Sequence, residues 1–165
     1  MEHLLTLLAD NFTYIGILLV VCVGILFLFC SDWNAIRRKA RHAIPINTKD
    51  FLDEWEYYRQ HDQAGCYVIL IYKRRPFIKT VKKNKRYQAV YIGQSINIHK
   101  RVYNHLTGHG NGDVYADVKY GKHVFVKFIP CDSEQLNKYE KELIRLFKAT
   151  DSYNRTKGGA KITAH

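Results

Sequence analysis

The chain contains few proline, methionine and cysteine residues. Its 165 residues include three Pro, one Met and four Cys. So little proline excludes a collagen, and 47% hydrophobic residues exclude an intrinsically disordered chain. The cysteines show neither a CxxC pair nor the Cys/His spacing of a zinc site, and two of them lie in an apolar run. We therefore expect Cys22, Cys30, Cys66 and Cys131 to be reduced thiols rather than a disulfide scaffold.

Positive charge is absent from the first part of the chain. Residues 1–31 contain no Lys or Arg, so residues 32–165 carry all 26 of them and the formal net charge is +11. This asymmetry indicates a basic module that meets nucleic acid or an anionic membrane surface.

No charged residue occurs between residues 11 and 31. The core of this segment reads YIGILLVVCVGILFLFC, and about 20 apolar residues span a bilayer as a helix. A buried core helix is the alternative, but such helices usually carry a polar face. A cleaved signal peptide would need a basic n-region and a small-residue cleavage site, which are missing. We predict a short extracytoplasmic N-terminus at 1–11 and a transmembrane helix at 12–31 that contacts the lipid bilayer.

A basic cluster follows the predicted span. Arg37-Arg38-Lys39-Ala40-Arg41 lies just after it, and basic residues favour the cytoplasmic side. The sequence therefore predicts a single-pass protein of the plasma (inner) membrane with its C-terminal part in the cytoplasm. Contact with DNA or acidic lipids is a compatible interpretation of the same cluster.

The segment 32–64 is predicted to be a basic juxtamembrane linker followed by an amphipathic helix. The linker includes a short connector at 43–47. The helix is indicated by apolar residues at helical spacing, which are Phe51, Leu52, Trp55 and Tyr58.

From residue 65 the pattern changes to that of a small α+β domain. The runs GCYVILIY, YQAVYIG and HVFVKFIP predict strands, with helices at about residues 96–106 and 133–148. The order β-β-α-β-α predicts a three-stranded antiparallel sheet flanked by helices. The basic stretch between the first two strands is expected to be a loop or hairpin tip, VYADVKYGK has no clear type, and 158–165 is a C-terminal tail.

Two short motifs lie on the first two predicted strands. Gly65-Cys66-Tyr67 and Tyr91-Ile92-Gly93 resemble the two halves of the GIY-YIG nuclease signature. The continuation YIGQSINIHKR places Arg101 at the position of the family's arginine, and His105 follows four residues later.

The resemblance extends to the second helix. Glu140-x-x-x-Ile144-Arg145 resembles the glutamate motif of the family, and Tyr153-Asn154 resembles its closing asparagine. We therefore identify residues 65–157 as a nuclease domain that resembles the GIY-YIG family. One departure is Gln94, where repair members have lysine, and it puts a lysine-assisted mechanism in doubt.

The resemblance implies hydrolysis of DNA with one Mg²⁺ or Mn²⁺ ion and no small-molecule cofactor. Tyr67 would orient or deprotonate the attacking water, Arg101 would stabilise charge on the phosphate, and Glu140 would hold the metal. Tyr91 and His105 would belong to the same catalytic network. Structural support is expected from Gly65, Gly93 and Asn154.

Residue periodicity gives an independent argument about Glu140. It falls inside the apolar stripe of its predicted helix, whereas Glu142 falls beside the polar face and is expected to be solvated. A carboxylate on the buried side is costly unless it binds something, either a metal ion or a basic partner such as Arg101. By strand parity Tyr67 and Tyr91 can point into one site, although strand tyrosines are usually core residues.

Basic side chains are predicted to contact DNA phosphates mainly from the loop after the first strand. They are Lys73, Arg74, Arg75, Lys82, Lys83, Lys85 and Arg86, with Lys100, Lys119, Lys122 and Lys127 elsewhere. The sequence shows no recognition helix or zinc finger, so weak sequence specificity is expected.

These features predict a membrane-anchored DNA endonuclease that acts on the cytoplasmic side. Tethering would confine it to DNA that enters at the membrane, in phage defence, superinfection exclusion or DNA uptake. One alternative is a catalytically silent DNA-tethering membrane protein on the same fold. Another is a basic protein that binds acidic lipids without metal dependence.

Overall fold

The computed structural model describes residues 2–154, and for residues 2–13 and 26–32 it describes the backbone alone. The chain divides into two compact units, Met1–Ala35 and Ile36–His165. Helix α1 (Glu2–His42) makes up the first unit and contributes its last residues to the second. The predicted tail at 158–165 and the last three residues of the predicted nuclease domain lie outside the described residues.

The predicted membrane span at 12–31 falls within α1. Among the described residues, no helix has both the length and the apolar character that crossing a membrane requires. The side chains of residues 12, 13 and 26–31 lie outside that description.

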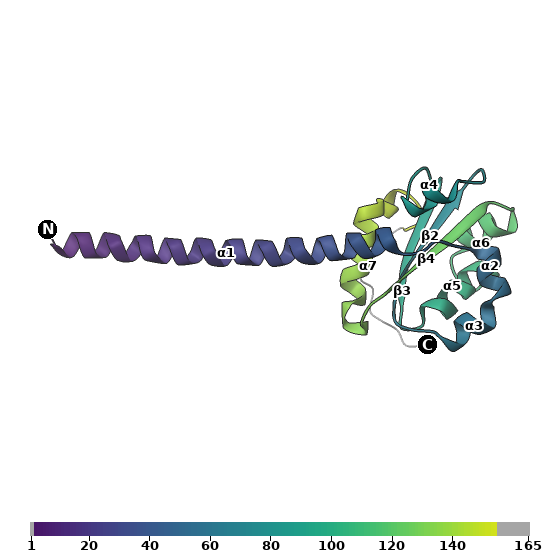
Figure 1. Ribbon diagram of the computed structural model, residues 1–165, viewed down its shortest axis with the longest axis horizontal. Helices are drawn as coiled ribbons and strands as arrows, with labels where there is room; N and C mark the ends of the chain where they lie inside the picture. Colours follow the sequence, from purple (N-terminus) through teal and green to yellow (C-terminus); the bar gives the residue numbers. More distant parts are fainter. Residues whose placement is uncertain (1, 155–165) are drawn as a thin grey trace. The chain divides into compact units, whose positions relative to one another are not determined.

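An antiparallel sheet of four strands forms the centre of the second unit (Figure 1). The strands are β1 (Ile46–Asn47), β2 (Gly65–Tyr72), β3 (Ala89–Ser95) and β4 (His123–Pro130), in the spatial order β1-β4-β2-β3. The α+β class and the antiparallel sheet are confirmed, but the prediction of three strands is wrong. The additional strand β1 pairs Ile46 with Val126 inside the predicted connector, and two residues are too short to show a strand period.

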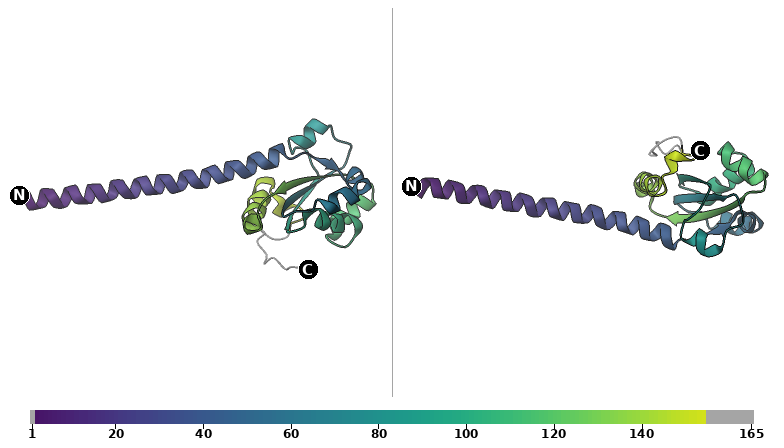
Figure 2. Two further views of the ribbon diagram at one scale, coloured as in Figure 1. Left: turned by 60° about the horizontal axis from the view of Figure 1, so that its bottom comes forward. Right: turned by 90° about the horizontal axis from the view of Figure 1, so that it is seen from above.

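Helices cover both faces of the sheet (Figure 2). On one face, α7 (Leu136–Phe147) and the end of α1 pack on alternate residues of β2 such as Val68 and Leu70. On the other face, α2 (Thr48–Asp53), α5 (Ile98–Thr107) and α6 (Gly112–Lys119) pack on Tyr67, Ile69 and Ile71. Every residue of β2 is buried because this strand lies in the middle of the sheet and has helices on both sides.

Several local elements differ from those predicted. The helix after the linker is interrupted at Glu54, which separates α2 from α3 (Trp55–Gln60). The basic loop contains a short helix, α4 (Ile78–Lys82), and the unassigned segment forms α6, whose N-terminus is capped by the Asn111 side chain. Two 3₁₀ turns, η1 (Ser133–Gln135) and η2 (Ala149–Asp151), flank α7.

Lys127 on β4 is fully buried, so the prediction that it contacts DNA phosphates is wrong. Its Nζ donates hydrogen bonds to the carbonyl oxygens of Ala40 at 3.2 Å and Lys82 at 3.1 Å. These carbonyls lie at the C-terminal ends of α1 and α4, where a positive charge is favoured. Burial nevertheless lowers the pKa of Lys127 to about 8.

The lowered pKa of Lys127 predicts a change of stability at alkaline pH. The unfolded chain holds the Lys127 proton more tightly between pH 8 and 10.5, so the contribution of Lys127 to the free energy of unfolding should rise as pH increases through this interval. The rise attributable to Lys127 is at most about 3 kcal/mol. In chemical denaturation at several pH values, the free energy of unfolding of the wild type should increase relative to that of Lys127→Met as pH rises from 8 to 10.5. Lys119→Met, on the exposed end of α6, is the matched control, and the same pH dependence in Lys127→Met as in the wild type would contradict the assignment.

Candidate active site at the edge of the sheet

The two motif tyrosines lie on neighbouring strands and face the same side of the sheet. Tyr67 on β2 pairs with Gly93 on β3, and Tyr91 pairs with Ile69. The centroids of the two tyrosine rings are 6.3 Å apart. The structure therefore brings the predicted pair together, as strand parity indicated.

Both motif glycines lie where neighbouring atoms leave no room for a side chain. A Cβ at Gly93 would overlap the hydroxyl group of Tyr67, whose ring lies across this position. A Cβ at Gly65 would lie 2.7 Å from the carbonyl oxygen of Ile129 on β4, which is shorter than van der Waals contact allows. Thus Gly65 permits β2 to approach β4, and Gly93 provides the space that the Tyr67 side chain occupies.

His105 on α5 connects Tyr67 to the loop that precedes α6. The hydroxyl oxygen of Tyr67 lies 2.8 Å from His105 Nε2, and the backbone N–H of Asn111 donates to His105 Nδ1 at 2.7 Å. Because Nδ1 accepts this hydrogen bond, it carries no proton, and a neutral ring must hold its proton on Nε2. His105 therefore donates to the Tyr67 oxygen.

Burial and nearby charges fix the protonation of this pair. Burial, together with the positive charge of Arg101, lowers the pKa of His105 to about 4. Burial and the neighbouring Tyr91 raise the pKa of Tyr67 well above its ordinary value, while Arg101 opposes this rise. At neutral pH His105 is neutral and Tyr67 is protonated, so the Tyr67 hydroxyl accepts from His105 and keeps its own proton to donate.

Glu140 reaches the site from α7, on the other face of the sheet. Gln94 Nε2 donates to Glu140 Oε2 at 3.1 Å and to Asn137 Oδ1 at 2.7 Å. Glu140 is half-buried because it borders the apolar stripe of α7 that includes Leu136 and Leu143. Its negative charge raises the pKa of both Tyr67 and Tyr91, after the larger effect of burial.

The expectation that Glu142 is a solvated bystander is wrong. Its side chain is only 23% exposed, and it forms an ion pair with Arg145 at 3.8 Å. A substitution of Glu142 would therefore disturb packing, and Glu134, exposed in η1, is the better control.

The site lies at an open edge of the sheet because β3 is an edge strand. Side chains from the α5 face and from the α7 face both reach this edge near Gly93. Asn154 fixes the strand there, since Ile92 N donates to Asn154 Oδ1 at 2.8 Å and Asn154 Nδ2 donates to Ile92 O at 2.6 Å. These two hydrogen bonds replace those that a further strand would make.

Oxygen atoms around Glu140 fit a hard divalent cation. Besides the Glu140 carboxylate and Asn137 Oδ1, the buried Gln94 Oε1 has no hydrogen-bond partner among the described residues. The described part of the chain contains no group of three or more His, Cys, Asp or Glu side chains that could hold a metal ion. This donor set suits an ion such as Mg²⁺, which binds through one or two carboxylates and completes its shell with water and phosphate oxygens.

Lys122 is half-buried and pairs with Asp117 at 2.6 Å, and Lys119 is exposed at the end of α6. The predicted DNA-binding side chains on α5 and between β2 and β3 are exposed and lie on two different parts of the domain. Lys100 is on α5, next to Arg101, which is itself exposed. The others belong to the segment between β2 and β3. Of these, Lys73, Arg74, Arg75 and Arg86 line one pocket, Lys83 and Lys85 line another together with Arg37 and Arg41, and Lys82 is exposed on α4.

Sequence reasoning missed the residues that position His105 and Glu140. Gly110 and Asn111 belong to the glycine-rich run GHGNGD. They contact His105 from the loop between α5 and α6, and a contact made from a loop produces no periodic pattern in the sequence. In the sequence Gln94 stands out only as a departure from lysine, whereas in the structure it connects β3 to Glu140 and Asn137.

A family model described as the GIY-YIG catalytic domain matches residues 63–154. The match covers more than half of the chain, so the chain belongs to the GIY-YIG family, and this membership indicates a nuclease. Members of this family typically use a divalent metal ion. Comparisons with curated proteins and with solved structures found no match.

The loop contact with His105 can be tested by a pair of glycine substitutions. A Cβ at Gly110 would overlap His105 Nδ1, whereas a Cβ at Gly112 would meet nothing within 4 Å. We expect Gly110→Ala to displace the imidazole ring and to destabilise the protein by about 1–3 kcal/mol. Imidazole ¹⁵N chemical shifts should show loss of the Nε2–H tautomer in Gly110→Ala and its retention in Gly112→Ala. Wild-type shifts in Gly110→Ala would contradict the contact.

Proposed function

We propose that the protein is a metal-dependent DNA endonuclease whose chemistry is organised around the Tyr67 hydroxyl. One observation carries this proposal. The hydroxyl is hydrogen-bonded to His105, and its pKa responds to Tyr91, Arg101 and Glu140. These interactions support a single site shared by the residues with predicted catalytic roles, and hydrolysis of a phosphodiester requires water-orienting and charge-stabilising groups close together.

Each group can be given a role from its position. The exposed guanidinium of Arg101 can contact the scissile phosphate and stabilise its developing charge. The Tyr67 hydroxyl keeps its proton at neutral pH and can orient a water molecule or a phosphate oxygen by donating a hydrogen bond to it. When bound at Glu140, Mg²⁺ or Mn²⁺ would supply Lewis-acid polarisation of a phosphate oxygen.

His105 acts in this scheme as a hydrogen-bond donor and not as a base. Its Nδ1 is occupied by the N–H of Asn111, and burial lowers the pKa of the ring to about 4. The Nε2–H group would occupy a lone pair of the Tyr67 oxygen and so leave the Tyr67 proton free to donate to water or to a phosphate oxygen.

Glu140 and Arg101 provide the test of catalysis. Glu140→Gln preserves the size of the side chain but removes the charge that holds the cation, and Arg101→Ala removes the phosphate contact. In a plasmid-nicking assay with Mg²⁺ we expect each variant to lose activity by at least about 100-fold. DNA binding by Glu140→Gln in EDTA should be unchanged.

The matched control is Glu134→Gln, which removes an exposed carboxylate of η1 and should retain wild-type nicking. Wild-type activity in Glu140→Gln would contradict the proposed metal ligand. DNA binding by the wild type without metal-dependent cleavage of any DNA form would favour the catalytically silent DNA-tethering protein.

We further infer that residues 12–31 anchor the protein in the plasma (inner) membrane, with the nuclease domain in the cytoplasm. Three features support this proposal. Residues 11–31 carry no charge, and the side chains described there, at 14–25, are all exposed. The basic run Arg37–Arg41 follows directly. Such an anchor would direct cleavage to DNA that enters at the membrane, as in phage defence, superinfection exclusion or DNA uptake.

Cell fractionation tests the anchor. The full chain should sediment with membranes and resist extraction by high salt, and a reporter fused after His165 should be active in the cytoplasm. Replacement of Leu18 and Val20 by Arg should release the protein, because charges within an apolar span oppose insertion. A wild-type protein in the soluble fraction, or a reporter outside the cytoplasm, would refute this localisation.

A further inference from the structure

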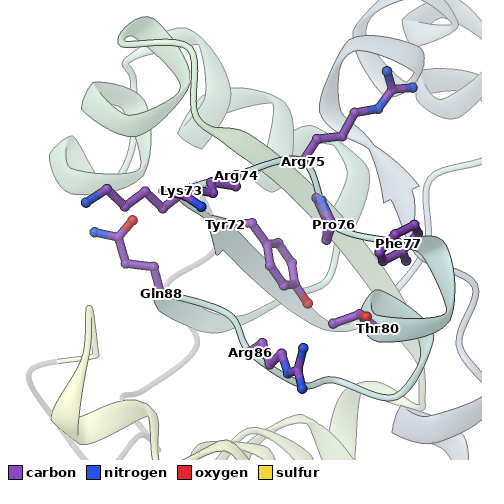
Figure 3. Close-up of a pocket in the computed structure, with 9 residues that line it drawn as sticks. All are labelled: Tyr72, Lys73, Arg74, Arg75, Pro76, Phe77, Thr80, Arg86 and Gln88. Carbon is purple, nitrogen blue, oxygen red and sulfur yellow. The ribbon is translucent and has the colours of Figure 1, made fainter.

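The pocket lined by Lys73, Arg74, Arg75 and Arg86 lies at the end of β2 opposite to the candidate active site. It has a volume of about 480 Å³ and is formed by the end of β2, the loop that follows and α4 (Figure 3). Tyr72 lines this pocket, and Tyr67 precedes it by five residues on the same strand. At about 3.4 Å per residue the two positions are roughly 17 Å apart. The pocket is therefore separate from the site around Tyr67.

Tyr72 brings a buried, unsatisfied hydroxyl to this pocket. The residue is only 3% exposed, and its hydroxyl has no hydrogen-bond partner in the part of the chain that the structure describes. Figure 3 shows this hydroxyl pointing toward the side of the pocket that Thr80 and Arg86 form. Because a buried hydroxyl without a partner is unfavourable, its position indicates a ligand that accepts a hydrogen bond.

The charge of the lining indicates that this ligand is an anion. Lys73, Arg74, Arg75 and Arg86 line the pocket, and the described lining residues include no Asp or Glu. Arg86 has a backbone φ of 57°, which is uncommon for a residue other than glycine. A phosphate group suits both the Tyr72 hydroxyl and the basic lining, since it accepts hydrogen bonds and pairs with arginine.

Phe77 adds an aromatic surface to the same pocket. Its side chain lines the pocket and is 85% exposed, which is unusual for phenylalanine. A nucleobase can stack on such a ring while its phosphate contacts basic side chains, as in proteins that bind single strands. In a duplex the faces of the bases are covered by neighbouring bases, so only an unpaired nucleotide can use both features.

We propose that this pocket binds an unpaired nucleotide of the DNA strand, with the phosphate near Tyr72 and Arg86 and the base on Phe77. This assignment rests on the proposed action on DNA and specifies its substrate as DNA with a single-stranded segment. A membrane surface rich in anionic lipids is the other phosphate-bearing partner. It is less favoured, because the Tyr72 hydroxyl lies in a recess and a membrane would contact a protruding apolar surface.

Fluorescence anisotropy of the full-length protein in mild detergent tests the proposal. The probes are a labelled oligothymidylate and a blunt duplex, both in EDTA so that binding is measured without cleavage. Phe77→Ala should weaken single-strand binding at least about fivefold and change duplex binding less than about twofold. Ile78→Ala, which removes a neighbouring exposed apolar side chain outside the pocket, should change neither.

Tyr72→Phe separates a ligand role from a structural role. Removal of an unpartnered hydroxyl should leave the melting temperature unchanged or higher, whereas single-strand affinity should fall. Arg86→Ala should weaken single-strand binding more than Lys79→Ala, which removes a charge from α4 outside the pocket.

Three results would overturn the proposal. The first is an equal loss of single-strand binding in Phe77→Ala and Ile78→Ala. The second is an equal loss of single-strand and duplex binding in Phe77→Ala. The third is that Phe77→Ala weakens binding to phosphatidylglycerol vesicles but not binding to DNA. Failure of the proposed nuclease function is seen separately, as an absence of Mg²⁺-dependent nicking. If nicking is absent while Phe77→Ala still loses single-strand binding selectively, the pocket assignment stands and the nuclease proposal fails.

Discussion

The close approach of Tyr67 to Gly93 across the neighbouring strands β2 and β3 determines how the rest of the domain is arranged. The side chain of Tyr67 lies where any larger residue at position 93 would place its Cβ. This contact requires the register in which Tyr67 faces Gly93. A shift of one residue would turn Tyr67 to the α7 face and separate it from His105. Strand register, the position of α5 and the hydrogen bond from His105 to Tyr67 are therefore coupled.

The second constraint is the position of β3 at the edge of the sheet. An edge strand leaves backbone groups unpaired, and here Asn154 satisfies both polar groups of Ile92. The same open edge allows groups from opposite faces of the sheet to meet, so Glu140 from α7 acts on Tyr67 although α5 and α7 lie on different sides. A central strand could not serve this purpose, because its neighbours would separate the two faces.

Positive charge in the domain has two structural roles. Lys127 is buried between β4 and the C-terminal ends of α1 and α4, where two carbonyl oxygens accept hydrogen bonds from its ammonium group. Arg86 and its basic neighbours are exposed around a pocket whose tyrosine hydroxyl has no hydrogen-bond partner among residues 2–154. The sequence shows the same residue types in both places. Only burial distinguishes a lysine that stabilises the fold from an arginine that is available to a phosphate.

The sequence by itself determined the elements that have a local signature. The three main strands, the helices of Arg101 and Glu140, and the family motifs are visible because residue spacing reflects the periods of strands and helices. The tertiary structure decided everything that depends on contacts distant in the sequence. The pairing of β1 with β4, the burial of Lys127 and the largely buried position of Glu142 belong to this group. So does the protonation of His105, because the hydrogen bond from Asn111 exists only after α5 and the following loop have packed together.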